Sequence, residues 1–306
     1  MDSTSPAYIT AEMVVAKLLD VDSAYVCALA DDPRRRLVWG IERNNSILFS
    51  IDADGELQSQ GRLPGWVRKP QFASCDVDGI VYFFDEDSWR IVGVDTLDMS
   101  EKFSYKPDGS VDSLCAATGG GVVIAAVRSE FLEVYRVDGK GKTVWSSQLP
   151  FEAVRYIRFG VDAFLAGSRA PILVSVQPLT TKLIGFDRNG NRMKATDWVA
   201  RNRKSATVAD SSGQPYQILS KCVIDISSGP VAQSVMMLYR ARLSETSERS
   251  IIFDWDAGSE PWARAILPEF DNYTSIAYVA GTSICAVGGT RVSDGRSVIW
   301  MVKLSH

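Results

Sequence analysis

Short apolar segments that end in aspartate recur along this chain. The first, ILFSID, ends at Asp52 and is followed by Asp54-Gly55, a second strand-like segment and Leu63-Pro64. An apolar run bounded by turn residues predicts a β-strand, and Asp-Gly favours a hairpin turn because glycine accepts a positive φ. Later copies of the segment are RIVGVD to Asp95, LEVYRVD to Asp138, KLIGFD to Asp187 and SIIFD to Asp254, and Asp138-Gly139 and Asn189-Gly190 are predicted turns.

Two markers keep one period over the first half of the chain. Asp52, Asp95 and Asp138 follow one another at intervals of 43 residues, and the later intervals lengthen to 49 and 67. A proline series has the same 43-residue interval, at Pro64, Pro107 and Pro150. Proline cannot donate to a sheet ladder, so each should mark the end of an outer strand. Two more strand-like runs precede each marked strand, and four short strands every ~40–45 residues indicate a blade of a β-propeller.

The repeat therefore predicts an all-β fold, a single six-bladed β-propeller over residues 1–306 with four-stranded antiparallel blades. The predicted blades are approximately 23–69, 70–110, 111–154, 155–204, 205–269 and 270–306, and residues 196–217 are interpreted as an extended loop. The last blade is one strand short, and an open ring would expose strand edges. We predict that Tyr8–Leu19 supplies the closing strand; a covering helix is the alternative, because Thr10 also resembles a helix N-cap.

One copy carries a resemblance to a known group of propellers. The segment Val134–Trp145, VYRVDGKGKTVW, resembles the Asp…Gly-Lys…Trp turn of quinoprotein-like and YVTN-type blades within the six-bladed β-propeller superfamily. The resemblance implies a propeller fold for the whole chain and brings no catalytic motif with it. Quinone-binding members are much longer and have more blades, so we expect no quinone and no other cofactor.

Composition and charge remove several function classes. Hydrophobic residues make up 46% of the chain, and the net charge of −4 with a pI near 5.2 gives no basic field for nucleic acid. The only histidine is His306, which disfavours catalytic triads and metal sites built on imidazole. Five cysteines without CxxC spacing and an N-terminus without a signal peptide or membrane span favour a cytoplasmic protein. We expect the propeller to be monomeric.

Candidate binding residues lie in connections that a propeller places on one face. Aromatic residues interleaved with arginine are typical of protein interfaces, because they combine apolar area with directed hydrogen bonds. The predicted partner-binding residues are Trp66, Arg68, Lys69, Trp89, Tyr105, Arg155, Trp198, Arg201, Arg203, Phe270 and Tyr273. For Trp66 and Trp198, a purely structural position between neighbouring blades is an equal alternative.

The leading hypothesis is a non-catalytic scaffold that recognises another protein through this face, as an inhibitor or immunity-type neutralising partner. We expect neither nucleic acid nor membrane as a partner. The competing hypothesis is a metal-dependent hydrolase or lyase that uses acids at the channel mouth, with Asp76 and Asp225 as the metal-binding residues. A glycan-binding propeller is a further alternative, although the sequence shows no repeated sugar pocket.

Overall fold

The chain folds almost entirely into β-strands. Its computed structural model describes residues 11–32, 34–117, 119–129, 131–150, 172–175, 182–186, 189–191, 207–209, 215–219, 223–226, 233–245, 251–254, 263–266, 270–279, 282, 284–291 and 294–303. Within these residues, 24 strands and one turn of helix are present. No helix in these ranges has the length and apolar character needed to cross a membrane.

Three consecutive four-stranded antiparallel sheets occupy the first half of the chain, each with its strands in sequence order. We call them blades 1, 2 and 3. Blade 1 contains β2 (Val26–Asp31), β3 (Val38–Glu42), β4 (Ile47–Ile51) and β5 (Leu57–Arg62). Blade 2 contains β6 (Pro70–Cys75), β7 (Ile80–Asp85), β8 (Arg90–Asp95) and β9 (Glu101–Tyr105). Blade 3 contains β10 (Ser110–Ala116), β11 (Val122–Val127), β12 (Phe131–Val137) and β13 (Thr143–Pro150). The strands predicted from the 43-residue period are confirmed here.

A fourth sheet, which we call the terminal sheet, combines the two ends of the chain. Its strands are β22 (Phe270–Tyr278), β23 (Ile284–Arg291), β24 (Ser297–Lys303) and β1 (Ala11–Val14). Strand β1 pairs antiparallel with β24, Ala11 opposite Met301 and Val14 opposite Val298. The helical turn α1 (Val15–Leu18) follows directly. The strand and the helix that the sequence offered as alternatives for this segment are thus both present.

The strands between blade 3 and the terminal sheet pair differently from the prediction. They are β14 (Ile172–Ser175), β15 (Lys182–Phe186), β16 (Thr207–Ala209), β17 (Pro215–Leu219), β18 (Val223–Ile226), β19 (Gln233–Glu245), β20 (Ile251–Asp254) and β21 (Ala263–Ile266). Pairing of β15 with β20 joins them into one eight-stranded sheet instead of two four-stranded ones. The predicted loop at 196–217 is wrong in part, because it contains β16 and the start of β17, which pair with each other.

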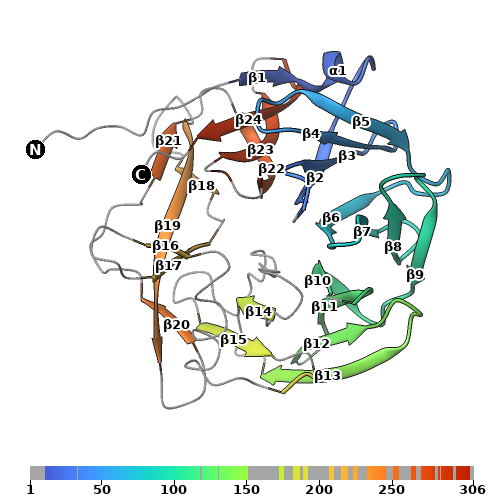
Figure 1. Cartoon of the computed structure of the whole chain (residues 1–306), viewed down its shortest axis with the longest axis vertical. Coiled ribbons are helices and arrows are strands. Elements are labelled where there is room, and N and C mark those ends of the chain that lie inside the picture. Colours follow the sequence, from blue (N-terminus) through green and yellow to red (C-terminus); the bar gives the residue numbers. More distant parts are fainter. Residues whose placement is uncertain are drawn as a thin grey trace, which may run out of the picture.

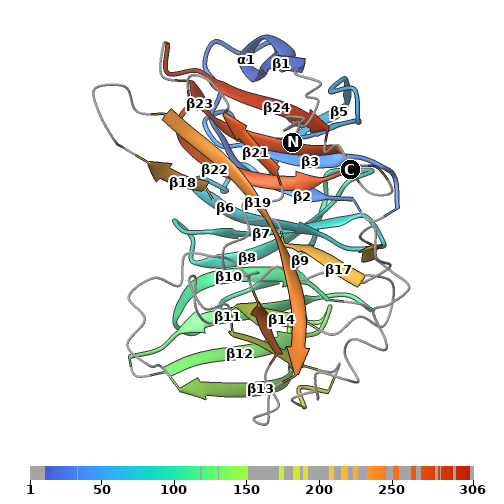
Figure 2. The same cartoon turned by 90° about the vertical axis from the view of Figure 1, so that its left-hand side faces the viewer.

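The sheets surround a common centre. Figure 1 shows β22, β2, β6 and β10 nearest that centre and β5, β9 and β13 at the periphery. In the view turned by 90°, the sheets of blades 1, 2 and 3 follow one another along the long axis of the molecule (Figure 2). The first strand of each sheet is therefore the inner strand, as in a propeller blade.

The recurring aspartates cap a recurring hairpin turn. Asp52 Oδ1 accepts the N–H groups of Asp54 and Glu56, and Asp138 Oδ1 accepts those of Lys140 and Lys142. In both turns the residue three positions after the aspartate is a left-handed glycine, Gly55 (φ 83°) and Gly141 (φ 80°). The turn predicted at Asp138-Gly139 is present, but its left-handed position falls on Gly141 and not on Gly139. Gly190 (φ 81°) occupies its predicted turn.

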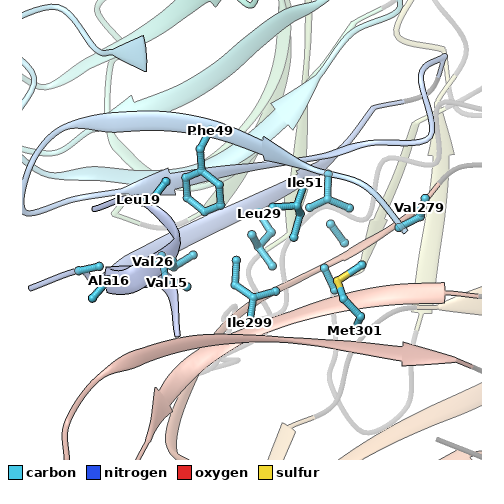
Figure 3. Packing of buried hydrophobic residues seen from close by; sticks show 14 residues of the cluster. Val15, Ala16, Leu19, Val26, Leu29, Phe49, Ile51, Val279, Ile299 and Met301 are labelled. Carbon is cyan, nitrogen blue, oxygen red and sulfur yellow. The ribbon is translucent and has the colours of Figure 1, made fainter. Parts of the chain in front are cut away.

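The terminal sheet and blade 1 share a core. Val15, Val26, Phe49, Ile299 and Met301 lie in one buried cluster that joins α1, blade 1 and the terminal sheet (Figure 3). A hydrogen bond from the Val26 N–H to Ser297 Oγ (2.8 Å) crosses the same boundary. The seam thus holds together segments from opposite ends of the sequence.

The other described seams combine apolar packing with hydrogen bonds between blades. Between blades 1 and 2, Arg35 Nη2 donates to Thr96 Oγ1 (2.8 Å). Between blades 2 and 3, the Ala116 N–H donates to Ser74 Oγ (2.9 Å) and the Gly121 N–H donates to the Tyr82 hydroxyl (3.1 Å). Buried clusters fill both seams, so each blade packs on the next through its sheet face.

The turn after the third strand of one blade also packs against the outer strand of the preceding blade. A Cβ on Gly61 in β5 would lie 2.5 Å from Met99 Cγ in blade 2. A Cβ on Gly190 would lie 2.5 Å from the ring of Trp145 in β13. The Asn189-Gly190 turn thus rests on blade 3 as the blade 2 turn rests on blade 1, which extends the same arrangement beyond residue 150.

The seam between the terminal sheet and blade 1 should be necessary for stability. Ile299 is fully buried there, so Ile299→Ala should lower the free energy of unfolding by about 2–5 kcal/mol, measured by urea denaturation. Leu97, which is 84% exposed, is the matched control, and Leu97→Ala should change stability by less than about 0.5 kcal/mol. Equal midpoints for the two variants would contradict this role of the seam.

Candidate functional site

One face of the described blades carries the candidate binding residues. In an antiparallel sheet the connections alternate between the two ends of the strands. The connections between blades (63–69 and 106–109) and the turns between second and third strands (43–46 and 86–89) therefore share one end. We call this end the entry face. The turns at 52–56, 76–79 and 138–142 lie on the opposite face.

The structure brings six residues of interest together on the entry face of blade 2. Trp66, Arg68 and Lys69 lie in the connection from blade 1, and Trp89 lies in the 86–89 turn. Arg90 begins β8 and Tyr105 ends β9. Arg68, Lys69 and Arg90 are exposed, whereas the three aromatic residues are half-buried. The order of the strands thus puts all six residues at the same end of blade 2.

Both tryptophans combine a structural contact with partial exposure. Trp66 packs against the core cluster of the blade 1–blade 2 seam, and the guanidinium carbon of Arg90 lies 5.8 Å from its ring centroid. Trp89 packs against the next seam and makes an edge-on contact with Phe84, with 5.3 Å between centroids. A structural position between blades and a role in binding were alternatives for Trp66. The partly exposed Trp66 ring is compatible with both.

A buried carboxylate holds the two segments that carry these residues. Asp85, at the end of β7, accepts the N–H groups of Arg68 (3.0 Å) and Lys69 (2.6 Å) through Oδ1, and that of Ser88 (3.0 Å) through Oδ2. Burial alone would raise the pKa of Asp85, but hydrogen bonds from Ser88, Lys69 and Arg68 outweigh it and lower the pKa. The carboxylate thus fixes the connection and the turn to each other.

Blades 1 and 3 also have a charged residue at the end of the second strand that binds the chain entering the blade. Glu42, at the end of β3, accepts the N–H groups of Tyr25, Asn44 and Asn45. In blade 3 the corresponding residue is Arg128, which binds Asp108 (2.8 Å) and Glu133 (2.6 Å). Sequence reasoning missed these corner residues, although an acid directly after the second apolar strand of blades 1 and 2 was a visible signal.

Asp76, one of the two acids of the competing enzyme hypothesis, lies on the opposite face. Asp76 is 3% exposed; its Oδ1 accepts the N–H groups of Asp78 and Ile80, and its Oδ2 accepts the Tyr82 hydroxyl. Burial is the main cause that raises the pKa of Asp76. Asp76 therefore caps a turn and links blade 2, through Tyr82, to Gly121 of blade 3. Asp225 lies in β18, and its side chain is outside the described residues.

Asp32 is a second buried carboxylate near Asp76, and its oxygens are also engaged. They accept the N–H groups of Arg34 and Arg35, the Arg35 Nε–H and the Trp39 Nε1–H. In the described part of the chain, no group of three or more histidine, cysteine, aspartate or glutamate residues is arranged to hold a metal ion.

The described cysteines occupy inner strands. Cys27 lies in β2, Cys75 in β6 and Cys115 in β10, all three as free thiols. Burial raises the pKa of Cys27 and of Cys115 to about 12, which keeps both sulfurs protonated and poorly reactive at neutral pH. These three cysteines therefore lie in the inner strands as small, unreactive side chains.

The remaining predicted binding residues receive little structural information. Phe270 and Tyr273 lie in β22 opposite Arg291 and Gly289 of β23, and their side chains are not described. Arg155, Trp198, Arg201 and Arg203 lie outside the described residues. The described entry face therefore rests on blades 1 to 3.

Comparisons with known proteins define the fold. No protein-family model and no curated protein sequence matches the chain. Solved structures do match, including hydrazine synthase of Kuenenia stuttgartiensis (12% identity, TM-score 0.50, covering 92% of this chain and 96% of that chain). A streptogramin B lyase has 10% identity, a TM-score of 0.52 and coverage of 96% and 98%. Virginiamycin B lyase of Staphylococcus aureus has 10% identity, a TM-score of 0.52 and coverage of 97% and 99%. These neighbours are β-propeller proteins, and at such identities the likeness shows the fold alone.

The Asp85 carboxylate should contribute a pH-dependent part of the stability. Its folded-state pKa lies below its unfolded value, so the contribution is complete above roughly pH 4 and disappears as the pH falls through the folded pKa. Asp85→Asn should lower the free energy of unfolding at pH 7 by about 1–3 kcal/mol, and the gap to the wild type should narrow on acidification.

Denaturant titrations of wild type and variant between neutral and acidic pH measure this gap. Asp87→Asn, at an exposed neighbour whose carboxylate pairs with Lys69, is the control and should behave like the wild type. A gap for Asp85→Asn that stays constant or widens on acidification would refute the proposed role of the ionised carboxylate.

Proposed function

We propose that this chain is a non-catalytic scaffold that binds another protein through its entry face. The observation that carries the proposal is the arrangement on blade 2, where exposed arginines stand beside half-buried tryptophans on segments fixed by Asp85. Side chains on a fixed backbone lose less conformational entropy on binding, which favours recognition of a large partner. Tryptophan and arginine are also the residues most enriched among interface hot spots.

We infer further that the whole chain is one propeller of six blades, closed by β1. Blade 1, blade 2, blade 3 and the terminal sheet are four of these six blades. The eight strands β14 to β21 equal the number that two further four-stranded blades require. Pairing of β1 with β24 supplies the closing strand. Such a ring is a monomeric platform with one continuous entry face.

Within this class, an inhibitor or immunity-type neutralising role fits a compact single-domain binder. We place it in the cytoplasm, where free thiols such as Cys27, Cys75 and Cys115 persist. The competing hydrolase or lyase function would need Asp76 as a metal ligand. Its two oxygens already accept three hydrogen bonds, so metal binding there would require breaking the turn and the link to Tyr82.

Affinity capture from a lysate of the source organism tests the scaffold function. The double variant Arg68→Glu/Arg90→Glu should lose most of the protein captured by the wild type, since both guanidinium groups are exposed on the entry face. The matched control, Lys140→Glu/Lys142→Glu, reverses two exposed charges on the opposite face and should retain the partner. If Arg68→Glu/Arg90→Glu retained the captured protein and Lys140→Glu/Lys142→Glu lost it, the interface would lie on the opposite face and the proposal would be wrong.

Calorimetric titration with calcium, magnesium and zinc separates the two function classes. We expect the same heats for the wild type and for Asp76→Asn, because the Asp76 carboxylate is occupied by its own turn. A saturable site that disappears in Asp76→Asn would overturn the scaffold proposal in favour of a metal-dependent enzyme.

A further inference from the structure

The charges on the entry face of blade 2 do not follow the charge of the chain. The chain carries a net charge of −4, yet every exposed acid of this region is engaged by a neighbour of its own. Asp87 pairs with Lys69 (3.6 Å), Glu86 accepts a hydrogen bond from Gln71 (2.9 Å), and Asp108 pairs with Arg128 (2.8 Å). The acids that remain, Glu42 and Asp85, are buried and bind backbone N–H groups.

Three cations of the same region have no ion-pair partner among the described residues. Arg68, Arg90 and Lys106 are exposed, and none of them forms an ion pair within the described residues. Arg90 lies over the face of Trp66, an interaction that leaves the rim of the guanidinium free to donate. The result is a group of exposed cations without ion pairs, with an indole beside them, on a backbone held by Asp85.

From these unpaired cations we infer that the entry face of blade 2 receives an acidic segment of the partner protein, with carboxylates bound by Arg68 and Arg90 and an apolar group against Trp66. The inference rests on the proposed scaffold function and specifies the chemistry of its partner. Arginine binds carboxylates through two parallel N–H groups, so it selects a planar anion as well as a charge. Because these two guanidinium groups have no ion-pair partner among the described residues, a carboxylate of the partner does not have to displace one.

An oligoglutamate peptide is a direct probe of this chemistry, with oligoglutamine as the uncharged control. At low ionic strength the wild type should bind oligoglutamate, and the indole N–H resonance of Trp66, assigned with Trp66→Phe, should shift during the titration. Arg68→Glu/Arg90→Glu should weaken binding about 10-fold or more, and Lys140→Glu/Lys142→Glu should not. Added salt should weaken binding, because the charges lie at the surface.

A charge exchange makes the test specific. Arg68→Glu/Arg90→Glu should gain affinity for oligolysine, which the wild type should not bind at this face. Equal binding of oligoglutamate by the wild type and the double variant would overturn the inference, as would tighter binding of single-stranded DNA through the same arginines. If the double variant loses the partner captured from lysate while oligoglutamate fails to bind the wild type, the acidic segment is wrong and the scaffold function stands.

Discussion

The structure depends on the burial of each sheet against its neighbours. Within the described residues, one turn of helix is the only helical element, so no helical layer covers the apolar faces of the blades. Phe49, Phe83 and Ile124 of blades 1, 2 and 3 are fully buried because an adjacent sheet lies against them. A four-stranded sheet with two apolar faces is stable only in such a series, and this explains why the ends of the chain meet in one sheet.

The corners of the blades show how this series is kept rigid at its polar ends. Glu42 and Asp85 are completely buried, and a buried carboxylate is tolerated only when it is well hydrogen-bonded. Each meets this requirement by accepting N–H groups from the chain that enters its blade and from the neighbouring turn. In blade 3 a cation takes this place: Arg128 forms ion pairs with Asp108 of the entering chain and with Glu133 of β12. The entry face is therefore a fixed frame on which exposed side chains are free to differ between blades.

The regular half of the chain was predictable because its signals are local. Asp-capped turns and strand-ending prolines are set by a few adjacent residues, and their recurrence every 43 residues located the strands of blades 1 to 3. The turn after Asp138 contains two glycines, so the sequence does not show which of them has a positive φ. The structure shows that it is Gly141. The pairing of β15 with β20 joins distant segments and has no local signal.

The candidate site was predictable in position more than in detail. The alternation of connections in a propeller blade is enough to predict that Trp66, Arg68 and Trp89 share one face. Their fixation by Asp85 depends on a residue 16 and 17 positions away from its partners in sequence, which only the fold brings into contact. Likewise, Arg68 and Arg90 have no ion pair among the described residues because the nearby acids Glu86 and Asp87 interact with Gln71 and Lys69. Only the folded surface shows these partners.

Hydrogen exchange on the complex with the captured partner tests the central claim most directly, because it reports the contact surface without substitutions. The account predicts slower exchange of backbone amides at 63–69 and 86–90 on complex formation, with the turns at 52–56 and 138–142 unchanged. Protection confined to those two turns would contradict the assignment of the binding surface to the entry face.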